Sequence, residues 1–130
     1  MKIVIDTKAV ISAFFLGGYP RQIVEAVMQG RFTAYATREI VEEYEASIAE
    51  IAARKGGSFR PNLALPFIAR LHIVAPNPVP DDDKFIACAL AARALYVVAD
   101  KRDFASIKSG RAATAITAEG CCLMLELCAS

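Results

Sequence analysis

The feature that most constrains the fold is an alternation of short apolar segments with longer segments of helical periodicity. Short apolar runs of strand length occur at Lys2–Ile5, 32–36, 71–74 and 95–99, with a weaker one at 115–116. Apolar residues repeat on one helical face in segments 20–29, 38–54 and 82–93. Strands that alternate with helices need crossover connections, which favour parallel strands covered by helices on both faces. The pattern therefore predicts a three-layer α/β/α sandwich around a central parallel sheet.

Length and composition favour one domain. The chain has 130 residues, of which 55% are hydrophobic, and this is a usual size for a single core. The Pro-rich stretch 75–84 is interpreted as a loop, because its flanking segments are too short to be separate domains. No run approaches the roughly eighteen apolar residues of a membrane span, and Asp6 and Lys8 interrupt the N-terminus before a signal peptide develops. We expect a cytoplasmic protein, residues 1–130, with no membrane segment.

The net charge does not exclude nucleic-acid binding, whereas the cysteine and histidine content excludes a structural zinc site. The formal net charge of +1 gives no general basicity for nucleic acid, although local patches matter more than the sum. The four cysteines form no C-x-x-C pair, and the chain has a single histidine. A zinc framework is therefore excluded, and the cysteines are expected to be buried free thiols.

The aspartates fall at strand ends and helix starts. Asp6 and Asp100 each follow an apolar strand directly, Asp81 to Asp83 precede a helix, and Asp103 lies three residues after Asp100. Because parallel strands end at one edge of a sheet, we expect these acids to gather there, near a switch in strand order. Clustered carboxylates repel one another unless a cation joins them, and hard oxygen ligands suit Mg²⁺ or Mn²⁺. The sequence predicts a carboxylate-held metal site, of a kind that activates water against a phosphodiester.

Structural interpretations stay open for some of these acids. A carboxylate at a helix start caps the helix and complements its dipole, so Asp81 and Asp82 are interpreted as caps and Asp83 as a ligand. Asp103 fits either a ligand or a local turn. A purely structural role is disfavoured for Asp6, because a polar side chain at a buried strand end costs free energy unless it has a partner.

The second predicted helix offers a further carboxylate. At about 100° per residue, its apolar stripe centres near Tyr44 and Ile48. Glu43 and Glu45 lie on the two margins of this stripe, whereas Glu42 lies nearly opposite. The helical wheel excludes Glu42 and does not choose between the other two.

Four short motifs follow one another along the chain. They are a strand followed by Asp6-Thr7, T-x-x-I-x-x-E from Thr37 to Glu43, D-x-x-I-A from Asp83 to Ala87, and D-x-x-D-F from Asp100 to Phe104. In this order and spacing, the chain resembles PIN-domain ribonucleases, in particular the toxin components of bacterial toxin–antitoxin pairs. The resemblance extends over nearly the whole chain and fades after about Thr117.

The resemblance implies an endoribonuclease that depends on Mg²⁺ or Mn²⁺. Its catalytic acids map onto Asp6, Glu43, Asp83 and Asp100, and its metal ligands onto Asp6, Asp83 and Asp100 with Asp103 as an auxiliary. The choice of Glu43 over Glu45 comes from this resemblance. The carboxylates would hold the metal, and an activated water would attack the phosphodiester.

The resemblance also implies partners, namely an RNA substrate, a small antitoxin protein and a second copy of the chain in a homodimer. RNA needs cationic contacts to its phosphates. The candidate contacts near the acid-bearing edge are Arg38, Lys84, Lys101 and Arg102. The apolar segment 11–20 is expected to pack partly in the core and partly at a surface for a partner.

Lys8 departs from the family pattern, which usually has Asn at this position. A lysine there either pairs with Asp6 and lowers metal affinity, or extends into solvent along its flexible stem. Both interpretations stay open. In the first, the chain is a catalytically weakened PIN domain that binds RNA or an antitoxin without cutting, and this is the alternative to an active nuclease.

Two other classes that place acids around Mg²⁺ are excluded at identifiable positions. Haloacid-dehalogenase-type enzymes usually need D-x-D after the first strand, and the third position here is Lys8. Receiver domains need a phospho-accepting Asp after a middle strand, and the strand at 71–74 is followed by Ala75 and Pro76.

Overall fold

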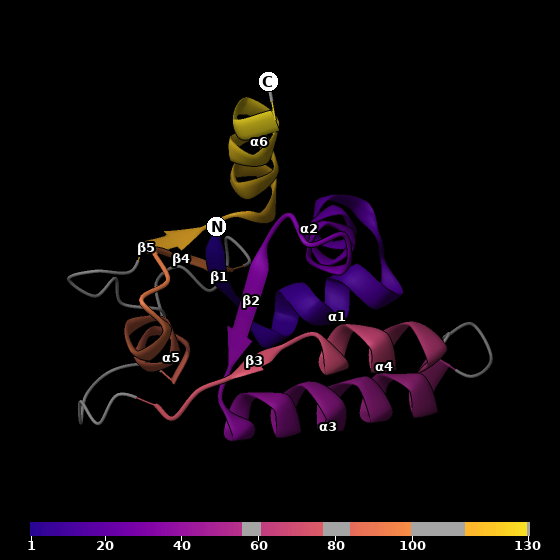
Figure 1. The fold of residues 1–130 in the computed structure, drawn as a ribbon. Helices are drawn as coiled ribbons and strands as arrows, with labels where there is room; N and C mark the ends of the chain where they lie inside the picture. The colour runs from indigo at the N-terminus through magenta and orange to yellow at the C-terminus, as the bar shows by residue number, and fades with distance from the viewer. Residues whose placement is uncertain (56–60, 77–83, 100–113, 130) are drawn as a thin grey trace.

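Strands and helices alternate along the chain, as the sequence predicts (Figure 1). The computed structural model describes residues 1–55, 61–76, 84–99 and 114–129. The strands are β1 (Lys2–Ile5), β2 (Thr33–Ala36), β3 (His72–Ile73), β4 (Tyr96–Val98) and β5 (Thr114–Ile116). The helices in the described ranges are α1 (Thr7–Phe15), α2 (Gly18–Met28), α3 (Arg38–Lys55), α4 (Pro61–Ala69), α5 (Lys84–Ala92) and α6 (Ala118–Ala129).

The five strands form one parallel sheet in the order β3-β2-β1-β4-β5. In the register of the sheet, Ile3 of β1 lies between Ala34 of β2 and Tyr96 of β4. The chain builds outward from β1 to β3 and then crosses back to add β4 and β5 on the other side of β1. The strand order therefore reverses between β1 and β4, and ligands of open parallel sheets bind at such a switch point.

Helices cover both faces of the sheet, which confirms the predicted three-layer sandwich. Figure 1 shows α5 on one side and α1 to α4 on the other. Helix α5 packs on β1, β2 and β4, and α3 packs on β2 and α1. Strand β1 is buried from Ile3 to Ile5 because it lies in the middle of the sheet under both helical layers.

Helix α3 positions the glutamates that the sequence singled out. Its start is capped by Thr37, whose hydroxyl accepts a hydrogen bond from the backbone N–H of Ile40 at 3.2 Å. Ile40, Tyr44 and Ile48 are buried and follow one another at four-residue spacing, as the predicted stripe requires. This orientation leaves Glu43 on one margin of the buried face.

The N-terminal apolar segment divides between the core and the surface. Residues 11–20 form the end of α1 and the start of α2. Phe14 is partly buried and packs edge-on against Phe67 of α4, with ring centroids 5.8 Å apart. Leu16 and Tyr19 are 77% and 45% exposed. Cys88, Cys121 and Cys122 are buried free thiols, as expected.

Membrane insertion finds no support in the described ranges, where no helix is both long and apolar enough to cross a bilayer.

Candidate active site

Asp6 lies at the switch point of the sheet. It follows the last residue of β1, and its backbone N–H donates to the carbonyl of Val98, the last residue of β4, at 2.9 Å. Its carboxylate Oδ1 accepts a hydrogen bond from the N–H of Ala9 at 2.8 Å and so caps α1. The sequence predicted the strand-end position but not this capping role. Asp6 thus connects the central strand, its neighbour β4 and the start of α1.

Capping alone does not explain a carboxylate at this position. Asp6 is only 3% exposed, and burying a charge costs much more free energy than burying a neutral polar group. Asn, Ser and Thr cap helices about as well as Asp does, without a net charge. The cap therefore accounts for a polar side chain at this position but does not require a carboxylate.

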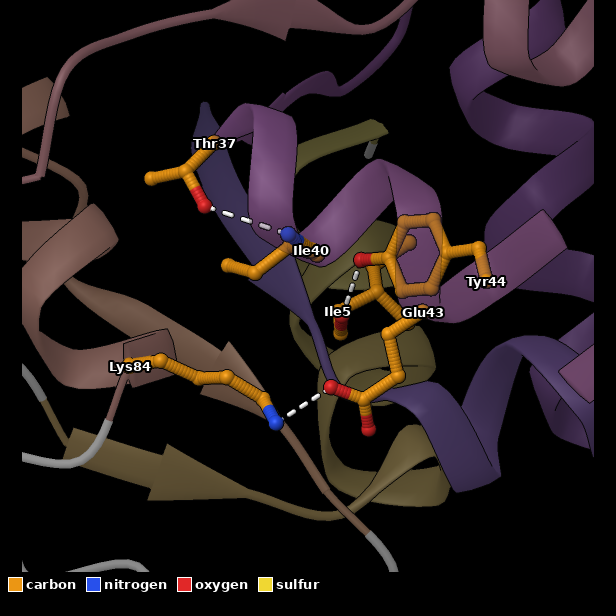
Figure 2. Close-up of polar contacts among 6 residues, drawn as sticks. All are labelled: Ile5, Thr37, Ile40, Glu43, Tyr44 and Lys84. Atoms are coloured by element: carbon orange, nitrogen blue, oxygen red, sulfur yellow. Dashed lines mark hydrogen bonds and ion pairs between the residues drawn. The ribbon is translucent and has the colours of Figure 1, made fainter. Parts of the chain in front are cut away.

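Glu43 points from α3 toward the start of α5, where it forms an ion pair with Lys84 (Figure 2). Both side chains are partly exposed, at 33% and 36%. Glu45, the other margin residue, is exposed and borders an apolar groove between α3 and α4 that includes Ile48 and Leu65. The two glutamates that the helical wheel left open therefore lie in different surroundings. Glu43 is paired with the Lys84 ammonium group, and Glu45 borders an apolar groove.

Tyr44 links helix α3 to the end of β1. Its fully buried hydroxyl donates to the carbonyl of Ile5 (Figure 2). Burial raises the pKa of the Tyr44 phenol well above its ordinary value, and electrostatic effects of Cys88, Asp6 and Glu43 raise it further. The hydrogen bond to Ile5 ties α3, which carries Glu43, to the end of β1, directly before Asp6.

The donor chemistry of these residues fits a hard divalent cation in part. Asp6 and Glu43 offer carboxylate oxygens, which Mg²⁺ and Mn²⁺ prefer. Next to Asp6, the hydroxyl of Thr7 is buried and has no hydrogen-bond partner within the described part of the chain. Among the described residues, no three His, Cys, Asp or Glu side chains come together as a set of metal ligands. Asp6 and Glu43 therefore offer oxygen donors of a suitable kind, but the described residues alone do not form a set of metal ligands.

The other predicted acids, Asp83, Asp100 and Asp103, lie outside the described residues, as do the candidate RNA contacts Lys101 and Arg102 and the capping candidates Asp81 and Asp82. Arg38 is exposed at the first position of α3. Lys84 is described, and its amine pairs with Glu43.

Lys8 is exposed in the first turn of α1. It borders a groove between α1 and α3, together with Ile11, Leu16, Ser47 and Arg54. Both interpretations of Lys8 stay open, and the effect of its charge on a metal site stays a prediction.

Two functional candidates were not singled out from the sequence. Tyr44 was read only as part of an apolar stripe, although a tyrosine in such a stripe needs a partner for its hydroxyl. Thr7 was noted only as part of the Asp6-Thr7 motif. A buried hydroxyl beside a buried acid is visible only once the fold is known.

A family model described as PIN domain matches residues 2–103. No curated protein and no solved structure matches the chain. PIN domains are generally nucleases and typically use divalent metal ions. With a matching family model over most of its length, a parallel sheet and buried Asp6 at the switch point, this chain belongs to the PIN domain family.

Proposed function

We propose that the chain is an endoribonuclease that depends on Mg²⁺ or Mn²⁺ and serves as the toxin of a toxin–antitoxin pair. The observation that supports the nuclease activity is the buried position of Asp6 at the switch point of a PIN-domain sheet, with the helix of Glu43 bonded to the same strand end through Tyr44. The metal would supply charge stabilisation and a water of lowered pKa at the phosphodiester. The toxin role follows from the resemblance to PIN-domain toxins.

The acidic residues would hold the metal ion, and the basic residues would contact the RNA. Asp6 and Glu43 would hold the cation together with Asp83, Asp100 and Asp103. The described neighbours of Asp83 and Asp100 support this grouping, because Lys84 pairs with Glu43 and Ala99 follows β4 at the switch point. Lys84 and Arg38, with Lys101 and Arg102, would contact RNA phosphates.

The sharpest test of the site uses the two glutamates of α3 as a matched pair. We expect Glu43→Gln to lower metal-dependent RNA cleavage by about tenfold or more, because it removes a charged ligand of the cation. Glu45→Gln should leave cleavage within about twofold of the wild type, since Glu45 borders the apolar groove between α3 and α4. Initial cleavage rates on labelled RNA measure both. Equal rates for the two variants would contradict the placement of Glu43 in the site.

A second candidate function is a catalytically weakened PIN domain that binds RNA or an antitoxin. The observation that favours it is the ion pair between Glu43 and Lys84, because the ammonium group of Lys84 already neutralises this carboxylate. Lys8, two residues after Asp6, adds a further positive charge near the acids. Cations in these positions oppose the binding of a metal ion.

Removing the charge of Lys8 tests this candidate. Two unit charges about 4 Å apart interact by about 1 kcal/mol in bulk water. We therefore expect Lys8→Asn to tighten Mn²⁺ binding by about threefold to tenfold. Lys8→Arg keeps the charge and should bind Mn²⁺ as the wild type does. Calorimetric titration with Mn²⁺ measures both. An inert wild type together with a cleaving Lys8→Asn would favour the weakened domain, and unchanged Mn²⁺ affinity would show that Lys8 has no such effect.

The proposed partners follow from the resemblance and from one surface. Leu16 and Tyr19 are exposed apolar residues near the turn between α1 and α2. Exposed apolar residues of this kind suit a protein partner. A small antitoxin and a second copy of the chain are the partners we propose.

A further inference from the structure

Tyr44 links the helix that carries Glu43 to the strand end that precedes Asp6. It directly follows Glu43 on α3, and its hydroxyl donates to the carbonyl of Ile5, the residue that directly precedes Asp6 (Figure 2). A single hydrogen bond therefore connects the backbone beside one acid to the helix that carries the other. The bond spans 39 positions of sequence, so no local turn sets this distance.

The hydroxyl is not needed to fill space. Tyr44 is fully buried, and a phenylalanine would cover the same apolar area. A buried hydroxyl costs free energy unless it is hydrogen-bonded. The side chain thus carries a polar group into the core where it bonds to the end of β1, and this points to a role for the bond itself.

The surroundings of the ring keep the hydroxyl in place. The ring packs against Phe67 of α4, with centroids 6.5 Å apart and planes at 44°. Ile40 and Ile48, one turn before and after Tyr44, are buried in the same face of α3. Close-packed side chains of this kind resist displacement, so a shift of α3 relative to β1 would have to move the Tyr44 ring as well.

We infer that Tyr44 is a positioning residue, whose hydroxyl fixes the spacing between Asp6 and Glu43 by anchoring α3 to the end of β1. The inference rests on the proposed function, in which these two acids hold the same cation. A metal site depends on the placement of its ligands, and loss of an orienting partner behind the ligands typically lowers metal affinity by about 10-fold to 100-fold.

The variant Tyr44→Phe removes the hydroxyl and keeps the ring. We expect it to bind Mn²⁺ about tenfold more weakly than the wild type in calorimetric titration with the metal alone. RNA cleavage should fall at limiting Mn²⁺ and recover largely at saturating Mn²⁺, because the defect lies in the spacing of the ligands and not in their identity.

Ile48→Val is the matched control, since it removes one methyl group from the same buried face one turn away. Both variants are expected to lower the urea midpoint, but Ile48→Val should bind Mn²⁺ within about twofold of the wild type. Wild-type Mn²⁺ affinity in Tyr44→Phe would overturn the inference, and so would an equal loss of affinity in Ile48→Val. If the wild type itself binds no Mn²⁺, the proposed function fails and the inference fails with it, which is a different result from either of these.

Discussion

Replacing Asp6 by Asn is expected to abolish RNA cleavage while the fold survives. Asp6 lies at the switch point of the sheet and is 3% exposed. Loss of a charged metal ligand removes several kcal/mol of transition-state stabilisation, and roughly 1.4 kcal/mol corresponds to a factor of ten in rate. We therefore expect the cleavage rate to fall by at least about a hundredfold. Initial rates on labelled RNA, measured at several Mn²⁺ concentrations, give the size of the effect.

The capping role of Asp6 allows chemistry to be separated from stability. Asn caps a helix about as well as Asp does, so Asp6→Asn should keep the hydrogen bond to the N–H of Ala9 and match or exceed the wild-type unfolding free energy in EDTA. Asp6→Ala loses the cap as well and should be less stable by about 0.5–2 kcal/mol. An Asp6→Asn variant that folds and still cleaves RNA near the wild-type rate would contradict the assignment of Asp6.

Replacing Phe67 by Ala is expected to have the largest effect on stability. Phe67 is fully buried in α4 and contacts two other helices, through Phe14 of α1 and Tyr44 of α3. Loss of a buried phenylalanine typically costs about 3–5 kcal/mol, which is a large share of the roughly 5–15 kcal/mol that stabilises a domain of this size. Urea unfolding measures the change in the free energy of unfolding.

Leu65→Ala provides the control on the same helix. Leu65 is 69% exposed, and surface substitutions usually change stability by no more than about 0.5 kcal/mol. A loss of less than 1 kcal/mol in Phe67→Ala would show that α4 does not hold α1 and α3 together. Because Tyr44 packs against Phe67, the alanine variant should also weaken Mn²⁺ binding, in the same direction as Tyr44→Phe.

The alternation of strands and helices was enough to predict the sheet, and the place of Asp6 followed from it. A polar residue directly after an apolar strand has only one edge of a parallel sheet to occupy. The stripe of α3 was also predictable, because Ile40, Tyr44 and Ile48 recur at helical spacing among polar residues.

Helices α1 and α4 were not predicted, for two different physical reasons. Residues of α1 are apolar on nearly all sides because α2 and α3 both pack against it, and a continuous apolar run does not distinguish a buried helix from a buried strand. Helix α4 contains Pro66, which normally ends or kinks a helix. Pro61 at its first position is the signal that was available, since proline is favoured there.

The details of the site depended on contacts between distant segments. The helical wheel treats Glu43 and Glu45 alike, and the choice of Glu43 came from the family resemblance. The structure adds a physical difference between them, because α5 places Lys84 beside Glu43. The link from Tyr44 to Ile5 joins residues far apart in sequence. Sequence periodicity carries no information about such pairs, so the Lys84 partner of Glu43 and the role of Tyr44 required the fold.

Cleavage of labelled RNA by the purified wild-type chain tests the central claim most directly. The chain would be incubated with several RNAs in Mn²⁺, in Mg²⁺ and in EDTA, with Asp6→Asn alongside as the inactive control. We predict cleavage that requires the metal, stops on addition of EDTA, and is absent in Asp6→Asn. Cleavage that persists in EDTA, equal cleavage by Asp6→Asn, or intact RNA in every reaction would contradict a metal-dependent ribonuclease built on Asp6.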